Sequence, residues 1–92
     1  MDDPIHIASL LVQVQPDRLV SVRDWLAAQS GAEIRGEDAA GKLVVVLESS
    51  GERAILDLIE ATEVREGTLS ANLVYHEIIN AEDAEQHEEV QP

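Results

Sequence analysis

The side chains that most often bind metals or transfer protons are scarce in this sequence. It contains three histidines, His6, His76 and His87, and no cysteine. His6 and His76 fall near one end of two predicted neighbouring strands, but the alternation of side chains places them on opposite faces. His87 lies in an acidic tail, and no histidine pair at helical spacing or close histidine–carboxylate cluster accompanies them. We therefore expect no metal site and no cofactor.

Other residues with catalytic potential lack the neighbours that catalysis requires. Ser9 has no evident base and no group that would orient one, so a hydrolase triad has no support. Glu88 and Glu89 are adjacent carboxylates, but a disordered tail cannot hold them in catalytic register. No glycine-rich phosphate loop is present. The sequence therefore predicts a protein that is not an enzyme.

The charge balance indicates which partners the chain attracts. Six Lys and Arg against 19 Asp and Glu give a formal net charge of −13. Nucleic-acid phosphates and anionic lipids repel such a surface, whereas a basic peptide is attracted to it. The start, Met1 to Pro4, is acidic, and no segment approaches the roughly 20 apolar residues that cross a bilayer. We expect a cytoplasmic protein that binds no nucleic acid and does not insert into membranes.

Six elements are predicted to position these side chains, in the order β-α-β-β-α-β. Apolar, β-branched segments predict strands at 5–14, 32–37, 42–48 and 68–79. Pro16 suits the first position of a helix that ends at Gly31. Ser49 and Glu52 match a capping box before a second helix, which ends before Gly67.

This order is typical of one α+β architecture, the ferredoxin-like split βαβ fold. In this fold a four-stranded antiparallel sheet has both helices on one face and the first and third strands in its middle. We expect one domain over residues 1–80, followed by an acidic, disordered tail over residues 81–92.

The sheet face without helices is predicted to carry an apolar stripe with a polar rim. Side-chain parity puts Ile7, Leu11, Val44, Val46 and Val74 in its middle, ringed by Ser9, Gln13, Asn72 and His76. A fully solvated antiparallel face is usually polar throughout, so this pattern favours a partner site. An amphipathic helix would suit it, with Glu33 and Glu48 as candidate counter-charges for basic residues.

Four segments of the chain resemble the NapD family of chaperones. In chain order they are SLLVQ at 9–13, SGAEI at 30–34, GKLVVVLE at 41–48 and GTLSANLVYH at 67–76. The likeness extends over nearly the whole predicted domain, from about Ile7 to His76. Thr68 departs from it, because an aliphatic residue is expected there, and the tail beyond Ile79 has no counterpart.

The resemblance implies a defined partner. Members of the family bind the twin-arginine signal peptide of NapA, the catalytic subunit of periplasmic nitrate reductase, in the cytoplasm. The peptide lies as a helix on the open sheet face, and export waits while the molybdenum cofactor is inserted and assembly is completed. The resulting candidates for the peptide-contacting set are Ser9, Leu11, Val44, Val46, Asn72, Val74 and His76.

Two other classes of function stay open on the sequence alone. One is a small-molecule regulatory domain of the ferredoxin-like type, which usually binds its ligand at a dimer interface. The other is an assembly module that pairs sheet to sheet with itself or with a larger enzyme. An RNA-binding domain of this fold needs aromatic stacking positions and a basic surface, and the middle strands offer neither. We expect a monomer, with weak self-association as the alternative.

Overall fold

The computed structural model describes residues 4–79 of the chain, and the order of its elements confirms the predicted one. The elements are β1 (Ile5–Val14), η1 (Pro16–Arg18), α1 (Leu19–Ala27), β2 (Ala32–Asp38), β3 (Lys42–Ser49), α2 (Glu52–Glu63) and β4 (Thr68–Ile79). The predicted tail at 81–92, with His87, Glu88 and Glu89, lies outside the described residues.

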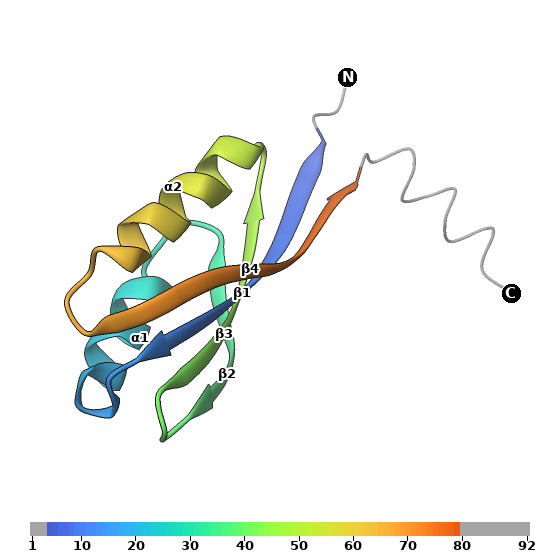
Figure 1. The fold of residues 1–92 in the computed structure, drawn as a ribbon. Helices are drawn as coiled ribbons and strands as arrows, with labels where there is room; N and C mark the ends of the chain where they lie inside the picture. The colour runs from blue at the N-terminus through green and yellow to red at the C-terminus, as the bar shows by residue number, and fades with distance from the viewer. Residues whose placement is uncertain (1–3, 80–92) are drawn as a thin grey trace, which may run out of the picture.

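The four strands form one antiparallel sheet in the order β2-β3-β1-β4. β1 and β3 are the central strands, and α1 and α2 lie together on one side of the sheet, as Figure 1 shows. The predicted fold class is therefore confirmed. Within residues 4–79, no helix lies on the opposite side of the sheet.

The core lies between the sheet and the two helices and consists of aliphatic side chains. Alternate residues of β1, from Ala8 to Val14, are buried together with Leu43, Val45 and Leu47 of β3. The helices contribute Leu19, Val22, Leu26, Ile55 and Leu58. The single tryptophan, Trp25, packs at the margin of this core, where the guanidinium of Arg65 lies 4.7 Å from its ring centroid. The alternation along β1 and β3 defines which residues face the helices.

Both helices begin differently from the prediction. Pro16 opens the short turn η1, and α1 starts only at Leu19. The predicted capping box is wrong, because β3 extends through Ser49 and Gly51 occupies the N-cap of α2. The Ser49 hydroxyl donates instead to the Gly51 carbonyl oxygen at 2.7 Å. A residue still paired in a strand is too early in the chain to cap this helix.

A bulge in β4 changes which residues share a face. Leu73 pairs with Leu10 and Tyr75 pairs with Ser9, so Val74 between them has no partner in β1. Because side chains alternate along a strand, one unpaired residue reverses the facing of every residue beyond it. The bulge therefore decides what the last third of β4 presents to solvent.

Candidate functional site

The side of the sheet away from the helices, here called the open face, is a grid of side chains. Residues paired across antiparallel strands point to the same side, so each row of the grid crosses the sheet. Each row is named here by its residue in β1. The Ile7 row contains Glu48, Ile7 and Glu77, and the Ser9 row contains Glu33, Val46, Ser9 and Tyr75. The Leu11 row contains Gly36, Val44, Leu11 and Asn72, and the Gln13 row contains Asp38, Lys42, Gln13 and Ser70.

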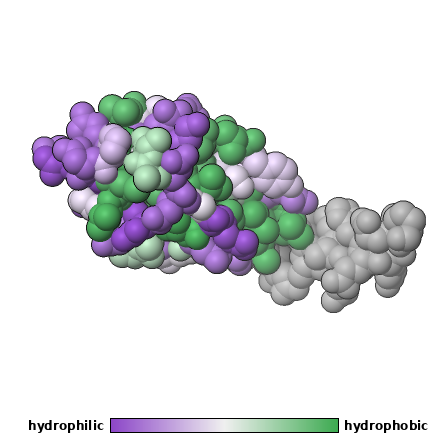
Figure 2. All heavy atoms as spheres, turned by 90° about the horizontal axis from the view of Figure 1, so that it is seen from below, coloured by the Kyte–Doolittle hydropathy of each residue, from purple (hydrophilic) through white to green (hydrophobic). Residues whose placement is uncertain are grey.

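The middle of the open face is apolar and only partly covered. Ile7, Leu11 and Val46 are half-buried among their neighbours, and Val44 is 40% exposed. Figure 2 views the molecule from below relative to Figure 1 and shows apolar residues interspersed with polar ones on that side. Aliphatic side chains gathered on a strand face without a covering layer are typical of a surface that binds a partner.

Five of the predicted contact residues lie on the open face, as expected. They are Ser9, Leu11, Val44, Val46 and Asn72. Val74 is the bulge residue; it has no partner in β1 and is 61% exposed. Their placement is confirmed, and their contact with a peptide stays a prediction.

The predicted facing of His76 is wrong. Beyond the bulge His76 pairs with Ala8, which is fully buried on the helix side. His6 lies on that same side, and its Nδ1 is 3.0 Å from Nε2 of His76, with the two rings stacked at a centroid distance of 5.2 Å. The two histidines are therefore partners on one face, not residues on opposite faces as parity predicted.

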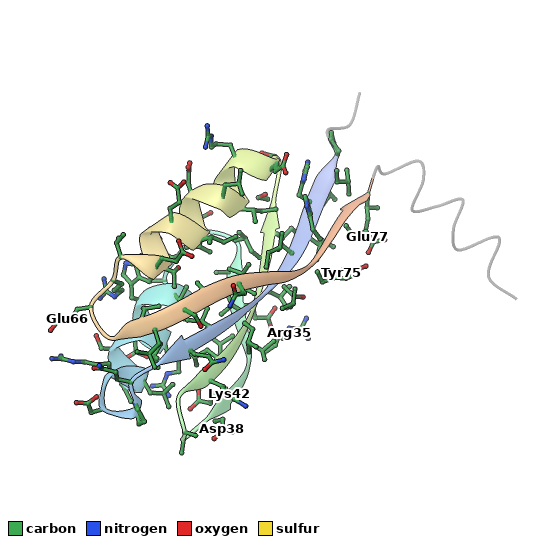
Figure 3. The ribbon with its side chains drawn as sticks, viewed as in Figure 1. Arg35, Asp38, Lys42, Glu66, Tyr75 and Glu77 are labelled. Carbon is green, nitrogen blue, oxygen red and sulfur yellow. The ribbon has the colours of Figure 1, made fainter. Side chains whose placement is uncertain are left out.

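Tyr75 and Glu77 take the place on the open face that parity assigned to His76. The Tyr75 hydroxyl donates to Oε1 of Glu77 at 2.5 Å, and Figure 3 shows both residues on the same side of β4. This hydrogen bond, followed by desolvation and the carboxylate charge, raises the pKa of the Tyr75 phenol. The sequence offered one signal for this site, because Tyr75 is the only tyrosine of the chain and lies in a predicted strand.

A hollow lies at the end of the open face next to Glu48. Its volume is about 380 Å³, and it is lined by Pro4, Ile5, Gly31, Glu48, Ser49 and Ser50. Gly31 has a φ of +80°, and a Cβ there would collide with the carbonyl oxygen of Glu48. The backbone N–H of Glu48 donates to the Gly31 carbonyl at 2.9 Å, which holds β3 against the start of β2. A glycine at this position thus permits the close approach that shapes the hollow.

The described residues show no arrangement that holds a metal ion. Within residues 4–79 no three His, Asp or Glu side chains gather in a metal-binding group, and His6 with His76 makes only a pair. Neither helix in this part of the chain has the length and apolar character to cross a membrane.

Comparison with known proteins connects this geometry to one family. A family model described as NapD protein matches residues 5–80. The chaperone NapD of Escherichia coli (strain K12) is 34% identical over 73 residues, covering 78% of this chain and 84% of the relative. The chaperone NapD of Paracoccus pantotrophus is 36% identical over 81 residues, covering 88% of this chain and 71% of the relative.

A solved structure agrees with the sequence relatives. The solution structure of the E. coli Tat proofreading chaperone protein NapD superposes with a TM-score of 0.74 at 33% identity. The match covers 84% of this chain and 82% of that one. The structural match and the sequence relatives therefore agree on the same family.

Proposed function

Because this chain belongs to the NapD family, we propose that it is a chaperone for the twin-arginine signal peptide of NapA, the catalytic subunit of periplasmic nitrate reductase. The peptide binds on the open face, and its capture holds back export until cofactor insertion and assembly are complete. The proposal assigns the chain no reaction of its own. It places the chain in the cytoplasm as a monomer.

The observation that carries this proposal is the uncovered apolar middle of the open face. Leu11, Val44 and Val46 are aliphatic residues on the side of the sheet that lacks a helix. An amphipathic helix binds such a surface by laying its apolar side on it. The opposite face of the same sheet is already covered by α1 and α2, so a bound helix would complete a second layer.

The dimensions of the open face suit a short helix. The Ile7 and Gln13 rows are six residues apart along β1, about 20 Å at the usual rise of a strand. A helix of about 13 residues has that length at 1.5 Å per residue. A helix is roughly 10 Å wide, so it would cover β1 and parts of β3 and β4, whose spacing is about 4.8 Å.

Charge on this chain would steer the peptide more than hold it. The formal net charge is −13, and a signal peptide carries its basic residues before its apolar segment. Exposed ion pairs contribute only about 0–1 kcal/mol each, whereas each buried methylene contributes about 0.8 kcal/mol. Most of the affinity should therefore come from the apolar rows.

The direct test is calorimetric titration of the full chain with a synthetic twin-arginine signal peptide from the NapA of the same organism. A second peptide with both arginines replaced by lysine is the matched control, because it keeps the charge but loses the planar, forked donors of arginine. We expect one-to-one binding of the first peptide and weaker binding of the second. Absence of binding to either peptide would refute the proposed function.

Self-association through the open face is the alternative that the geometry also permits. Two copies would each bring a charge of −13 to the contact, which opposes their association. Sedimentation of the full chain at high concentration separates the two interpretations. A stable dimer whose dissociation accompanies peptide binding would show that a second copy competes for the same face.

A further inference from the structure

The open face is not uniform in charge along the strands. In the Ile7 row, Glu48 and Glu77 lie on either side of Ile7. Neither carboxylate forms an ion pair with any residue of the described part of the chain, 4–79. Among the described residues, Glu77 accepts a hydrogen bond only from the Tyr75 hydroxyl. This end of the open face, here called the acidic end, therefore carries two carboxylates that have no cationic partner within residues 4–79.

The basic residues of the open face lie away from the acidic end, one at the opposite end and one near the middle. Lys42 pairs with Asp38 in the register of β2 and β3 and lies in the Gln13 row. Arg35, at a bulge in β2, forms an ion pair with Glu33 at 3.3 Å. Figure 3 shows Arg35, Lys42 and Asp38 on the same side of the sheet as Tyr75 and Glu77 but nearer the β2–β3 hairpin. Lys42 and Arg35 thus each have a carboxylate beside them, whereas the acidic end has an excess of negative charge that attracts a cationic peptide segment.

The spacing in the Ile7 row suits two neighbouring cations. Glu48 and Glu77 are two strand spacings apart, about 10 Å between backbones. Successive residues of an α-helix point about 100° apart, so two adjacent long side chains reach to opposite sides of the line where the helix touches the sheet. One cation would then meet Glu48 while the next meets Glu77.

The two carboxylates have different surroundings, and both suit an arginine side chain. On one side, the walls of the 380 Å³ hollow include Pro4 and Ile5, against which the methylene stem of an arginine can pack. The carboxylate of Glu48, which also lines the hollow, can pair with the guanidinium. On the other side, Tyr75 is 51% exposed beside Glu77, and its ring offers a face on which a guanidinium can stack.

We propose that the signal-peptide helix lies along β1 in one direction only, with its arginine pair at the acidic end. One guanidinium occupies the hollow at Glu48, and the other lies against Tyr75 and Glu77. The apolar segment that follows the arginines runs over Leu11 and Val44 toward the β2–β3 hairpin. This inference rests on the proposed function and adds to it the orientation of the peptide and the residues that recognise its basic pair.

A further charge supports this direction. The N-terminus of a helix carries a partial positive charge, and in this orientation it lies at the acidic end. The reversed peptide would instead bring its arginines to Lys42, which lies beside Asp38.

The first test compares two double variants of the full chain by calorimetry with the twin-arginine peptide. Glu48→Gln with Glu77→Gln removes the carboxylates of the acidic end, and we expect binding about 10-fold weaker. Glu60→Gln with Glu63→Gln removes the same charge from exposed positions on α2 and should leave affinity within about twofold. With the double-lysine peptide, the loss from the first pair of substitutions should be smaller.

Each outcome separates the orientation from the proposed function. Absence of peptide binding to the unmodified chain contradicts the function itself. Normal affinity in the Glu48→Gln, Glu77→Gln variant contradicts the orientation but leaves the function standing. Equal loss in both double variants means that only the total charge matters, and it also overturns the orientation.

The second test reads the direction without any substitution in the chain. A spin label at the N-terminus of the peptide should broaden the NMR signals of Ile7 and Glu77 in the isotope-labelled full chain. A label at the C-terminus should broaden those of Gln13 and Lys42. The reverse pattern, or equal broadening of both ends by either label, would overturn the proposal.

Discussion

The two faces of the sheet are built from the same strands but differ in what covers them. Along β1, Leu10 and Val12 are fully buried under α1 and α2, whereas Ser9, Leu11 and Gln13, which alternate with them, face away from the helices. Both sets include aliphatic residues. The covered face is closed by the helices of the chain, and the open face keeps half-buried aliphatic side chains beside carboxylates. The comparison shows that the same strands supply a covered layer, which stabilises the fold, and an uncovered layer, to which we assign the proposed peptide binding.

The largest expected effect is on the free energy of unfolding, when each of two adjacent leucines that face opposite sides of the sheet is replaced by alanine. Leu10→Ala leaves a cavity in the core and should lower the free energy of unfolding by about 2–5 kcal/mol. Leu11→Ala on the open face should lower it by about 1 kcal/mol or less, while weakening peptide binding about 5- to 10-fold. Urea unfolding and calorimetry measure the two quantities. Equal losses of stability would contradict the division of roles between the faces.

A carboxylate introduced on the open face, compared with one introduced on a helix, tests through binding affinity whether the peptide lies on the open face. Val44→Glu puts a carboxylate under the apolar side of the bound helix and should weaken binding about 30-fold, because the buried charge finds no partner there. Val20→Glu is the matched control on α1, where the side chain is 57% exposed. Both variants should keep the far-ultraviolet circular dichroism of the folded chain. Equal affinity in the two variants would place the peptide elsewhere.

The smallest expected effect concerns Tyr75, whose phenol has a raised pKa owing first to its hydrogen bond with Glu77. Folding favours the protonated phenol, so this small contribution to stability is complete below the ordinary pKa of tyrosine and is lost as pH rises through the folded value. Glu77→Gln should lower the midpoint of tyrosinate formation, measured by absorbance of the single tyrosine. Glu60→Gln on α2 is the control, and an equal shift in both would point to net charge alone.

The fold and most of the open face were predictable because they depend on patterns within each segment. β1 and β3 pair from Gln13–Lys42 to His6–Ser49 without an irregularity, so simple alternation places Leu11, Val44 and Val46 correctly. The element order follows from apolar periodicity in the same way.

The errors in prediction arose where pairing between strands decides the outcome. The bulge at Val74 exists only because of how β4 meets β1, and the segment Leu73-Val74-Tyr75 contains no glycine or proline that would indicate it. His76 was therefore assigned to the wrong face, and the exposure of Tyr75 on the open face was missed. The capping box failed for a similar reason, since the pairing of Ser49 with His6 extends β3 to the residue that was expected to cap α2.

The bulge at Val74 also bears on how sequences of related chains should be aligned. Deleting that one residue would remove the bulge, and Tyr75 and Glu77 would still pair with Ser9 and Ile7 and face away from the helices. A homologue that lacks the bulge residue would therefore display the same chemistry to the same ligand, provided that the one-residue gap is placed at Val74. An alignment without that gap would match Tyr75 with a residue that faces the helices, and it would assign the wrong side chains to the open face.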